Sequence, residues 1–173
     1  MILKVGRSKT GGTVRIPGSK SHTIRSLFIA SFAEGRSEIL NPLVSDDALS
    51  AVEVCKALGA DINILEDKFT VQGFNSIPIT PNDVINAGNS GTTINFALSA
   101  AALGESCSVF TGDYQIRRRP LGPLITALNN LGANVSSTRN NGMPPVIVKG
   151  RLKGGSTELD GVTSQYLSSI LLS

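Results

Sequence analysis

The chain has 173 residues, of which 40% are hydrophobic and 17% charged, which is enough apolar content for an ordinary buried core. Its net charge of +3 is too small to predict a polyanion-binding surface, so we expect no nucleic-acid partner. No apolar run approaches the roughly 20 residues of a membrane-spanning helix, and we expect no membrane partner. Because the first residues lack a secretory signal, we expect a cytoplasmic protein. Cys55 and Cys107 both lie in apolar surroundings and are predicted to be buried thiols without a function.

In chain order, the first predicted unit extends from about residue 14 to 74. Ser19-Lys20-Ser21 opens a helical stretch with apolar residues at helical spacing, and Asp46-Asp47 opens a second helix that stops at Gly59. A strand pair with alternating polar and apolar residues follows. The predicted elements of this unit are helix 19–35, helix 46–59 and strands 61–64 and 69–71.

The second predicted unit, about 84–150, repeats this order. Asn89-Ser90-Gly91-Thr92-Thr93 opens its first helix, and Pro120, a favoured residue of the first helical turn, opens its second. Strands at 134–136 and 145–148 complete the unit. The distance from Ser19 to Ser90 is 71 residues, and the Leu-Gly-Ala triplets that end the second helices lie 73 residues apart. This agreement predicts a genuine structural repeat.

A third copy, about 156–173, begins at Gly161-Val162-Thr163-Ser164-Gln165, where Ser164 follows Ser90 by 74 residues. Only one apolar helix is present in it. A repeat unit buries its hydrophobic face against its neighbours and is not stable alone. We therefore expect residues 1–173 to be an incomplete α/β (α+β) domain of repeated units, with a truncated third unit.

The three helix starts at Ser19, Ser90 and Thr163 carry small hydroxyl residues. Free backbone N–H groups and the positive end of the helix dipole attract anions at such positions, although the same residues also serve as ordinary caps. Three converging starts would provide several anion donors. Lys20 and Arg25 add cations at the first start, and Ser21 lies on the same helical face as Arg25.

Arg117-Arg118-Arg119 places three mutually repelling guanidinium groups together, which an anion or nearby carboxylates would compensate, because arginine binds both oxygens of a carboxylate or phosphate; most such runs, however, are simply solvated. Gly91 would let a ligand approach the backbone closely. His22, the single histidine, is assigned no role. The sequence contains neither a nucleotide-binding glycine motif nor a metal-ligand cluster, so we expect no cofactor and no metal site.

Several of these motifs, in this order, resemble the 5-enolpyruvylshikimate-3-phosphate synthase family, and the resemblance covers essentially the whole chain as the front part of such an enzyme. The motifs are Pro17-Gly18-Ser19-Lys20-Ser21 with Arg25, Asn89-Ser90-Gly91-Thr92-Thr93, Gly112-Asp113 before Arg119-Pro120, and Thr163-Ser164-Gln165-Tyr166-Leu167.

The resemblance implies two domains, each an inside-out α/β barrel of three βαβαββ units with helices inside and sheets outside. It also implies transfer of the enolpyruvyl group of phosphoenolpyruvate to the 5-hydroxyl of shikimate 3-phosphate, with release of phosphate, in aromatic amino acid biosynthesis. We expect a monomer at full length. The resemblance further implies that glyphosate occupies the phosphoenolpyruvate site, where Gly91 leaves room for it.

The resemblance also implies roles for single residues. Lys20 corresponds to a catalytic lysine shared by both substrates. The residues that match shikimate 3-phosphate contacts are Lys20, Ser21, Arg25, Thr163, Ser164 and Gln165. Those that match phosphoenolpyruvate contacts are Lys20, Gly91, Arg119 and Gln165. The family's acid and base groups come from the second half of the enzyme, so we expect this chain alone to be inactive.

Three positions depart from the family's usual residues: Asn95 replaces an arginine, Ile24 an asparagine and Thr163 a serine. Two alternatives remain. The sister enzyme that transfers enolpyruvate to UDP-N-acetylglucosamine carries a reactive cysteine in the loop before the Arg-Pro pair, which the loop from Gly112 to Arg117 lacks. An RNA-binding or RNA-processing βαβαββ repeat protein should interleave aromatic and basic residues, whereas here only Tyr114 lies near the arginine run.

Overall fold

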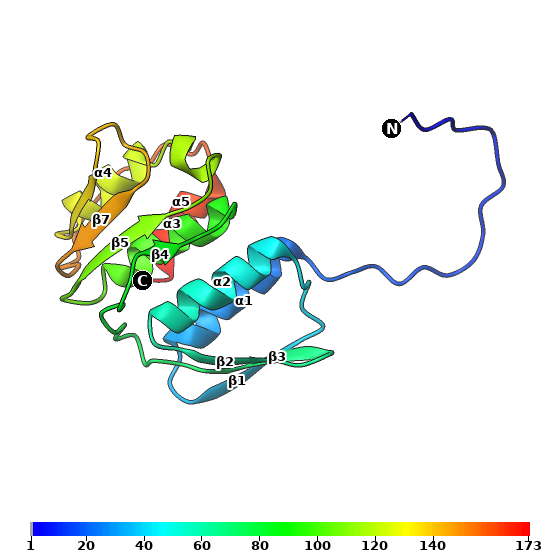
Figure 1. The fold of residues 1–173 in the computed structure, drawn as a ribbon, viewed down its shortest axis with the longest axis horizontal. Coiled ribbons are helices and arrows are strands. Elements are labelled where there is room, and N and C mark those ends of the chain that lie inside the picture. Colours follow the sequence, from blue (N-terminus) through cyan, green and yellow to red (C-terminus); the bar gives the residue numbers. More distant parts are fainter. Residues whose placement is uncertain (1) are drawn as a thin grey trace.

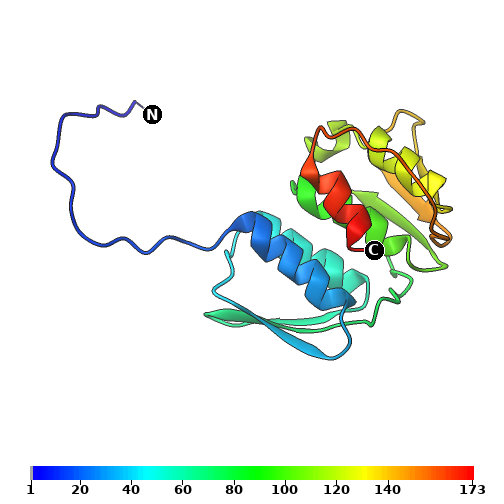
Figure 2. The ribbon, with the colours of Figure 1, turned by 180° about the vertical axis from the view of Figure 1, so that it is seen from behind.

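The fold is described by a computed structural model of residues 2–173. Residues 2–19 form no helix or strand, and in Figures 1 and 2 this blue segment runs away from the folded body. Val14 and Ile16 are 79% and 78% exposed. The first predicted unit begins near residue 14, whereas the first regular element of the structure is the helix that starts at Lys20.

The first unit consists of two helices over one three-stranded sheet (Figure 1). Ser19 and Ser45 cap the helices by accepting the N–H groups of His22 and Ala48. Gly59 has a φ of +117° just after the second helix, a left-handed conformation that favours glycine. The strand order is β1-β3-β2, and both pairings are antiparallel. The elements are α1 (Lys20–Phe32), β1 (Arg36–Leu40), α2 (Asp46–Ala57), β2 (Asp61–Ile64) and β3 (Lys68–Gln72).

The second unit has the full βαβαββ order. Its sheet has the strand order β4-β5-β7-β6, in which β4 and β5 are parallel and the other pairs antiparallel. The elements are β4 (Ile85–Asn86), α3 (Gly91–Ala101), β5 (Cys107–Thr111), the 3-10 helix η1 (Ile116–Arg118), α4 (Gly122–Asn130), β6 (Asn134–Ser137) and β7 (Val146–Lys149).

The prediction that the second helix of this unit starts at Pro120 was wrong by two residues. Helix α4 starts at Gly122 and has Pro123 in its first turn. The chain leaves η1 at Arg118, and the N–H of Leu121 donates to the carbonyl of Gly142 at 2.8 Å before the helix begins. Pro120 therefore belongs to the connection and not to the helix.

Helix α5 (Ser164–Leu171) packs along α3. Helix α3 contacts α1, α2 and α5, helix α1 also contacts α2, and the two sheets lie outside these helices (Figures 1 and 2). The rings of Phe28 on α1 and Phe96 on α3 meet edge to face with centroids 5.5 Å apart. The two units therefore share one hydrophobic core, and an α/β fold of helices inside and sheets outside is observed.

The two cysteines differ in environment. Cys55 lies on α2 and is buried in the hydrophobic core, where desolvation raises the pKa of its thiol to about 12. Cys107 is exposed, which contradicts the prediction of two buried thiols. It is the first residue of β5, where alternate side chains point outward. Within residues 2–173, no helix has both the length and the apolar character to cross a membrane.

Candidate functional site

The predicted helix starts are all capped by their hydroxyl residues. The side chains of Ser19, Ser90 and Thr163 accept backbone N–H groups of His22, Thr93 and Gln165 at 3.4, 3.4 and 3.2 Å. These contacts fix where α1, α3 and α5 begin. The remaining N–H groups of each first turn stay available to an anion.

The start of α1 carries the two predicted cations. The ammonium group of Lys20 lies 2.5 Å from a carboxylate oxygen of Asp47 in the first turn of α2, and its side chain is 54% exposed. A ligand can therefore reach it. The guanidinium of Arg25 donates to the hydroxyl of Ser21 and, at 3.3 Å, to the hydroxyl of Ser168 on α5. It also lies 5.3 Å from the centre of the Phe96 ring, so α3 and α5 both hold it in place.

The start of α3 is buried and carries no cation of its own. Ser90 and Thr93 are 2% and 0% exposed, and their hydroxyl oxygens are 2.7 Å apart. A Cβ atom added to Gly91 would lie 2.2 Å from a guanidinium nitrogen of Arg119. The Arg119 side chain therefore lies directly against the backbone of this helix start, and only glycine permits that approach.

The start of α5 meets the same region. The side-chain amide of Asn95 on α3 donates to the side-chain oxygen of Gln165 at 2.8 Å. The hydroxyl of Tyr166 donates to the carbonyl of Pro120 at 3.0 Å, which ties the loop that carries Arg119 to α5. Thr163 forms the cap of this helix, and the exposed Ser164 is its first residue.

Contacts between elements join these starts into one region. The Thr93 hydroxyl reaches the carbonyl of Asp47 at 3.5 Å, so α2 connects the start of α1, through Lys20, to the start of α3. Asn95 then connects α3 to α5. The structure thus brings together the predicted residues Lys20, Ser21, Arg25, Gly91, Arg119, Thr163, Ser164 and Gln165 at the amino ends of three helices.

Sequence reasoning missed two residues of this region. It treated Asp47 only as a helix opener, although an acidic residue in a first turn was a possible partner for Lys20. It noted Asn95 only as a departure from the family. Its contact with Gln165, 70 positions away, depends on how α3 and α5 pack and has no local signal.

The arginine run divides into two parts. Arg119 reaches Gly91, whereas Arg117 donates to the carbonyl of Gly112 at 3.1 Å. Arg139 donates to the carbonyl of Arg117 at 3.2 Å. Arg117 and Arg118 line a separate hollow of about 390 Å³ together with Tyr114, Arg139 and Pro145. The run therefore contributes one guanidinium, not three, to the candidate site.

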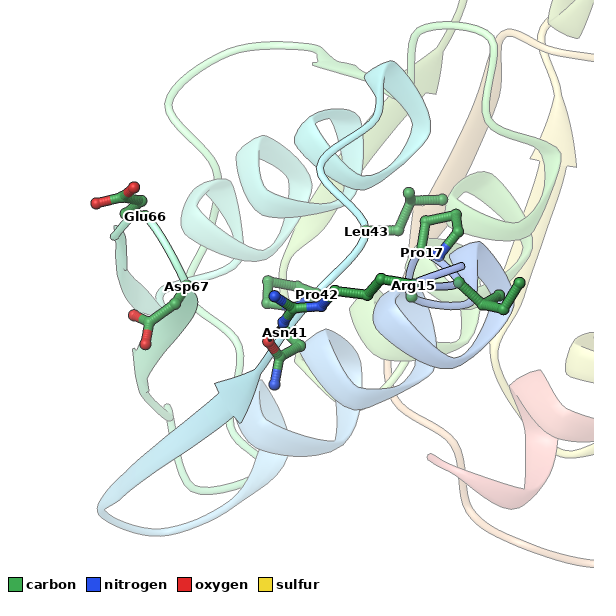
Figure 3. A pocket seen from close by; sticks show the side chains of 9 residues that line it. Arg15, Pro17, Asn41, Pro42, Leu43, Glu66 and Asp67 are labelled. Carbon is green, nitrogen blue, oxygen red and sulfur yellow. Dashed lines mark hydrogen bonds between the residues drawn. The ribbon is translucent and has the colours of Figure 1, made fainter. Parts of the chain in front are cut away.

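A larger hollow of about 450 Å³ lies elsewhere, where the N-terminal segment passes the end of β1 (Figure 3). Arg15 donates to the side-chain oxygen of Asn41 at 3.0 Å there, and Glu66 and Asp67 line the opposite wall. None of the predicted site residues lines it. Among residues 2–173, no cluster of three or more His, Cys, Asp or Glu side chains could hold a metal ion.

Fold and site together define a protein of repeated α/β units whose helix amino ends gather with three cations at one place. Comparison with known proteins identifies its family. The sequence profile of EPSP synthase (3-phosphoshikimate 1-carboxyvinyltransferase) matches residues 5–173. The chain therefore belongs to the EPSP synthase family, which confirms the resemblance seen in the sequence motifs.

Individual relatives agree with this assignment. The chain is 69% identical to the 3-phosphoshikimate 1-carboxyvinyltransferase of Acetivibrio thermocellus and 54% identical to that of Ruminiclostridium cellulolyticum, each over 99% of its length. It spans 41% of the length of both relatives. Its fold matches the structure of EPSP synthase from Acinetobacter baumannii with a TM-score of 0.86 at 30% identity, over 93% of this chain and 38% of the other.

Proposed function

We propose that this chain forms part of an enzyme that transfers the enolpyruvyl group of phosphoenolpyruvate to the 5-hydroxyl of shikimate 3-phosphate. In this reaction the hydroxyl gives up its proton to a base and its oxygen adds to the enol carbon of phosphoenolpyruvate, while the methylene carbon gains a proton from an acid. Loss of a proton and of phosphate from the resulting tetrahedral adduct gives the product. The observation that carries the proposal is the meeting of three helix amino ends with Lys20, Arg25 and Arg119.

The distribution of donors suits two phosphorylated substrates. Ser21 and Arg25 on one side, with Thr163 and Ser164 on the other, would bind the 3-phosphate, because Arg25 already spans α1 and α5. Arg119 over Gly91 would bind the carboxylate or phosphate of phosphoenolpyruvate, since a guanidinium binds two oxygens at once. Gln165 would lie between the two substrates. The proposed enzyme acts as a cytoplasmic monomer.

Lys20 would stabilise the charge that develops at the reacting centre. Asp47 supports this role by holding the ammonium group at the amino end of α2. A ligand that displaces or shares this carboxylate would find a lysine already directed toward the other donors. The acid and base groups are expected from the part of the enzyme beyond this chain.

The test is a full-length hybrid in which residues 1–173 replace the matching segment of the Acetivibrio thermocellus enzyme. We expect phosphate release from phosphoenolpyruvate that depends on shikimate 3-phosphate, inhibition by glyphosate, and no turnover by the chain alone. UDP-N-acetylglucosamine as the acceptor is the specificity control. A folded hybrid that releases no phosphate with shikimate 3-phosphate, while the unmodified relative does, would refute the proposal.

A further inference from the structure

Asn95 lies in the middle of the contact between α3 and α5 and is 1% exposed. Its side-chain nitrogen donates to the oxygen Oε1 of Gln165 at 2.8 Å. Its own oxygen, Oδ1, is buried and accepts no hydrogen bond from residues 2–173. An unsatisfied buried acceptor costs about 1–3 kcal/mol. The fold tolerates this cost at a side chain whose nitrogen atom holds Gln165 in place.

The backbone around Asn95 is fixed to α5. The hydroxyl of Ser169 donates to the carbonyl of Asn95 at 2.6 Å, and the hydroxyls of Ser99 and Ser169 are 2.5 Å apart. Both serines are 1% exposed. Asn95 therefore cannot move away from Gln165 without breaking the packing of the two helices.

The contact determines which end of the Gln165 amide is free. Because Oε1 already accepts from Asn95, the NH2 group of Gln165 is the end that remains for a ligand. We propose that Asn95 is a positioning residue that holds Gln165 so that its NH2 group, and not its carbonyl oxygen, is presented to an anionic substrate. This inference rests on the proposed function.

The opposite orientation would be worse in two ways. If the Gln165 NH2 group donated to the oxygen of Asn95, the buried NH2 group of Asn95 would have no acceptor. Two buried donors would then be unsatisfied, in place of the one oxygen that is unsatisfied now. The Gln165 carbonyl oxygen would then face a phosphate or carboxylate and repel it. The observed orientation adds a further donor beside the first turn of α5, which also favours anions.

The experiment uses the full-length hybrid with three variants and measures the KM of each substrate, kcat and the unfolding midpoint at pH 8. Asn95→Asp replaces the donor with an acceptor and forces Gln165 to donate inward. Asn95→Leu, of similar size, removes the contact without imposing an orientation. Gln165→Glu keeps an acceptor for Asn95 and replaces the free NH2 group with a negative oxygen.

We expect Asn95→Asp and Gln165→Glu to raise the KM of at least one substrate about tenfold or more, since each removes a charge-assisted hydrogen bond and adds repulsion. Asn95→Leu should raise it about threefold, and kcat should change less. If the role of Asn95 were purely structural, the KM would rise only as the unfolding midpoint falls. Asn95→Leu and Asn95→Asp would then have similar effects on the KM.

If Asn95→Asp does not fold, Gln165→Glu is compared with a fourth variant, Gln165→Leu, and this pair decides because Gln165 is only half-buried. Gln165→Glu should have the larger KM. The inference is overturned if Gln165→Glu leaves both KM values unchanged, or if a folded Asn95→Asp is no worse than Asn95→Leu. An unmodified hybrid without activity would refute the proposed function itself and this inference with it, so the two failures are distinguishable.

Discussion

The two repeat units build the same feature, the start of their first helix, in opposite ways. In the first unit, Ser19 and Lys20 are exposed, and the cations belong to the helix itself. In the second unit, Ser90 and Thr93 are buried, and the cation Arg119 arrives from the loop before α4. The repeat therefore supplies similar backbone donors twice, while side chains and neighbouring helices decide how each set is used.

The cause of the difference is the position of each helix. Helix α3 is packed against α1, α2 and α5, so its first turn is enclosed and only glycine leaves space for an arginine. Helix α1 contacts α2 and α3, and its first turn stays open. Substitutions at the two helix starts should therefore differ in their effects.

Both units depend on one core, and Phe28→Ala is expected to show it. Phe28 is 1% exposed and packs edge to face on Phe96 of the other unit. Its loss should lower the free energy of unfolding by about 3–5 kcal/mol, measured by denaturant titration. The adjacent Ile29→Ala is the control, because Ile29 is 52% exposed and should cost little. Similar costs for the two variants would mean that the contact of Phe28 with Phe96 does not hold the two units together.

The open start should contribute most to turnover. In the hybrid enzyme, Lys20→Ala is expected to lower kcat about 10²–10³-fold, the usual effect of removing a donor that stabilises developing charge. Lys56→Ala is the matched control, since Lys56 lies in the last turn of α2 and pairs with Glu53. Steady-state phosphate release distinguishes them. Equal rates for both variants would show that Lys20 does not act at the reacting centre.

The enclosed start should be sensitive to a single methyl group. Gly91→Ala places a Cβ atom against the Arg119 guanidinium and should displace it, raising the KM of phosphoenolpyruvate about tenfold through loss of a charge-assisted hydrogen bond. Gly122→Ala is the control, because nothing lies within 4 Å of the atom it adds. The contrast between the two units fails if both alanine variants retain the KM of the unmodified enzyme.

The caps provide the smallest test. Ser90→Ala removes a buried hydroxyl bonded to Thr93, whereas Ser19→Ala removes an exposed one. We expect losses of about 1–2 and about 0.5 kcal/mol, so that the enclosed cap exceeds the open cap by about 1 kcal/mol. Thermal or denaturant unfolding of the two variants measures this difference. A larger loss for Ser19→Ala would reverse the comparison.

Much of this fold could be predicted because its signals are local. Helix periodicity and small polar caps located α1, α2, α3 and α5, and the repeat predicted their order. Strands β1, β4 and β5 were not located from the sequence, and β4 has only two residues, Ile85 and Asn86, which carry no periodicity. Its strand role depends on parallel pairing with β5, which only the folded sheet defines.

The site was predictable to the extent that its residues start helices. Helix capping and the dipole point to Ser19, Ser90 and Thr163 in any amphipathic helix. By contrast, the division of the arginine run between Gly91 and the Gly112 carbonyl depends on the turn of η1 and on packing between elements. Contacts such as Lys20 with Asp47 likewise arise only after the helices assemble.

We propose that helix starts far apart in the chain form one substrate site. Titration of the isotope-labelled chain with shikimate 3-phosphate, followed through its backbone amide NMR signals, tests this. We expect concentration-dependent shifts in two groups at once, around Lys20 and Ser21 and around Thr163 to Gln165. No shift in either group, or shifts confined to the hollow around Arg118 and Arg139, would contradict it.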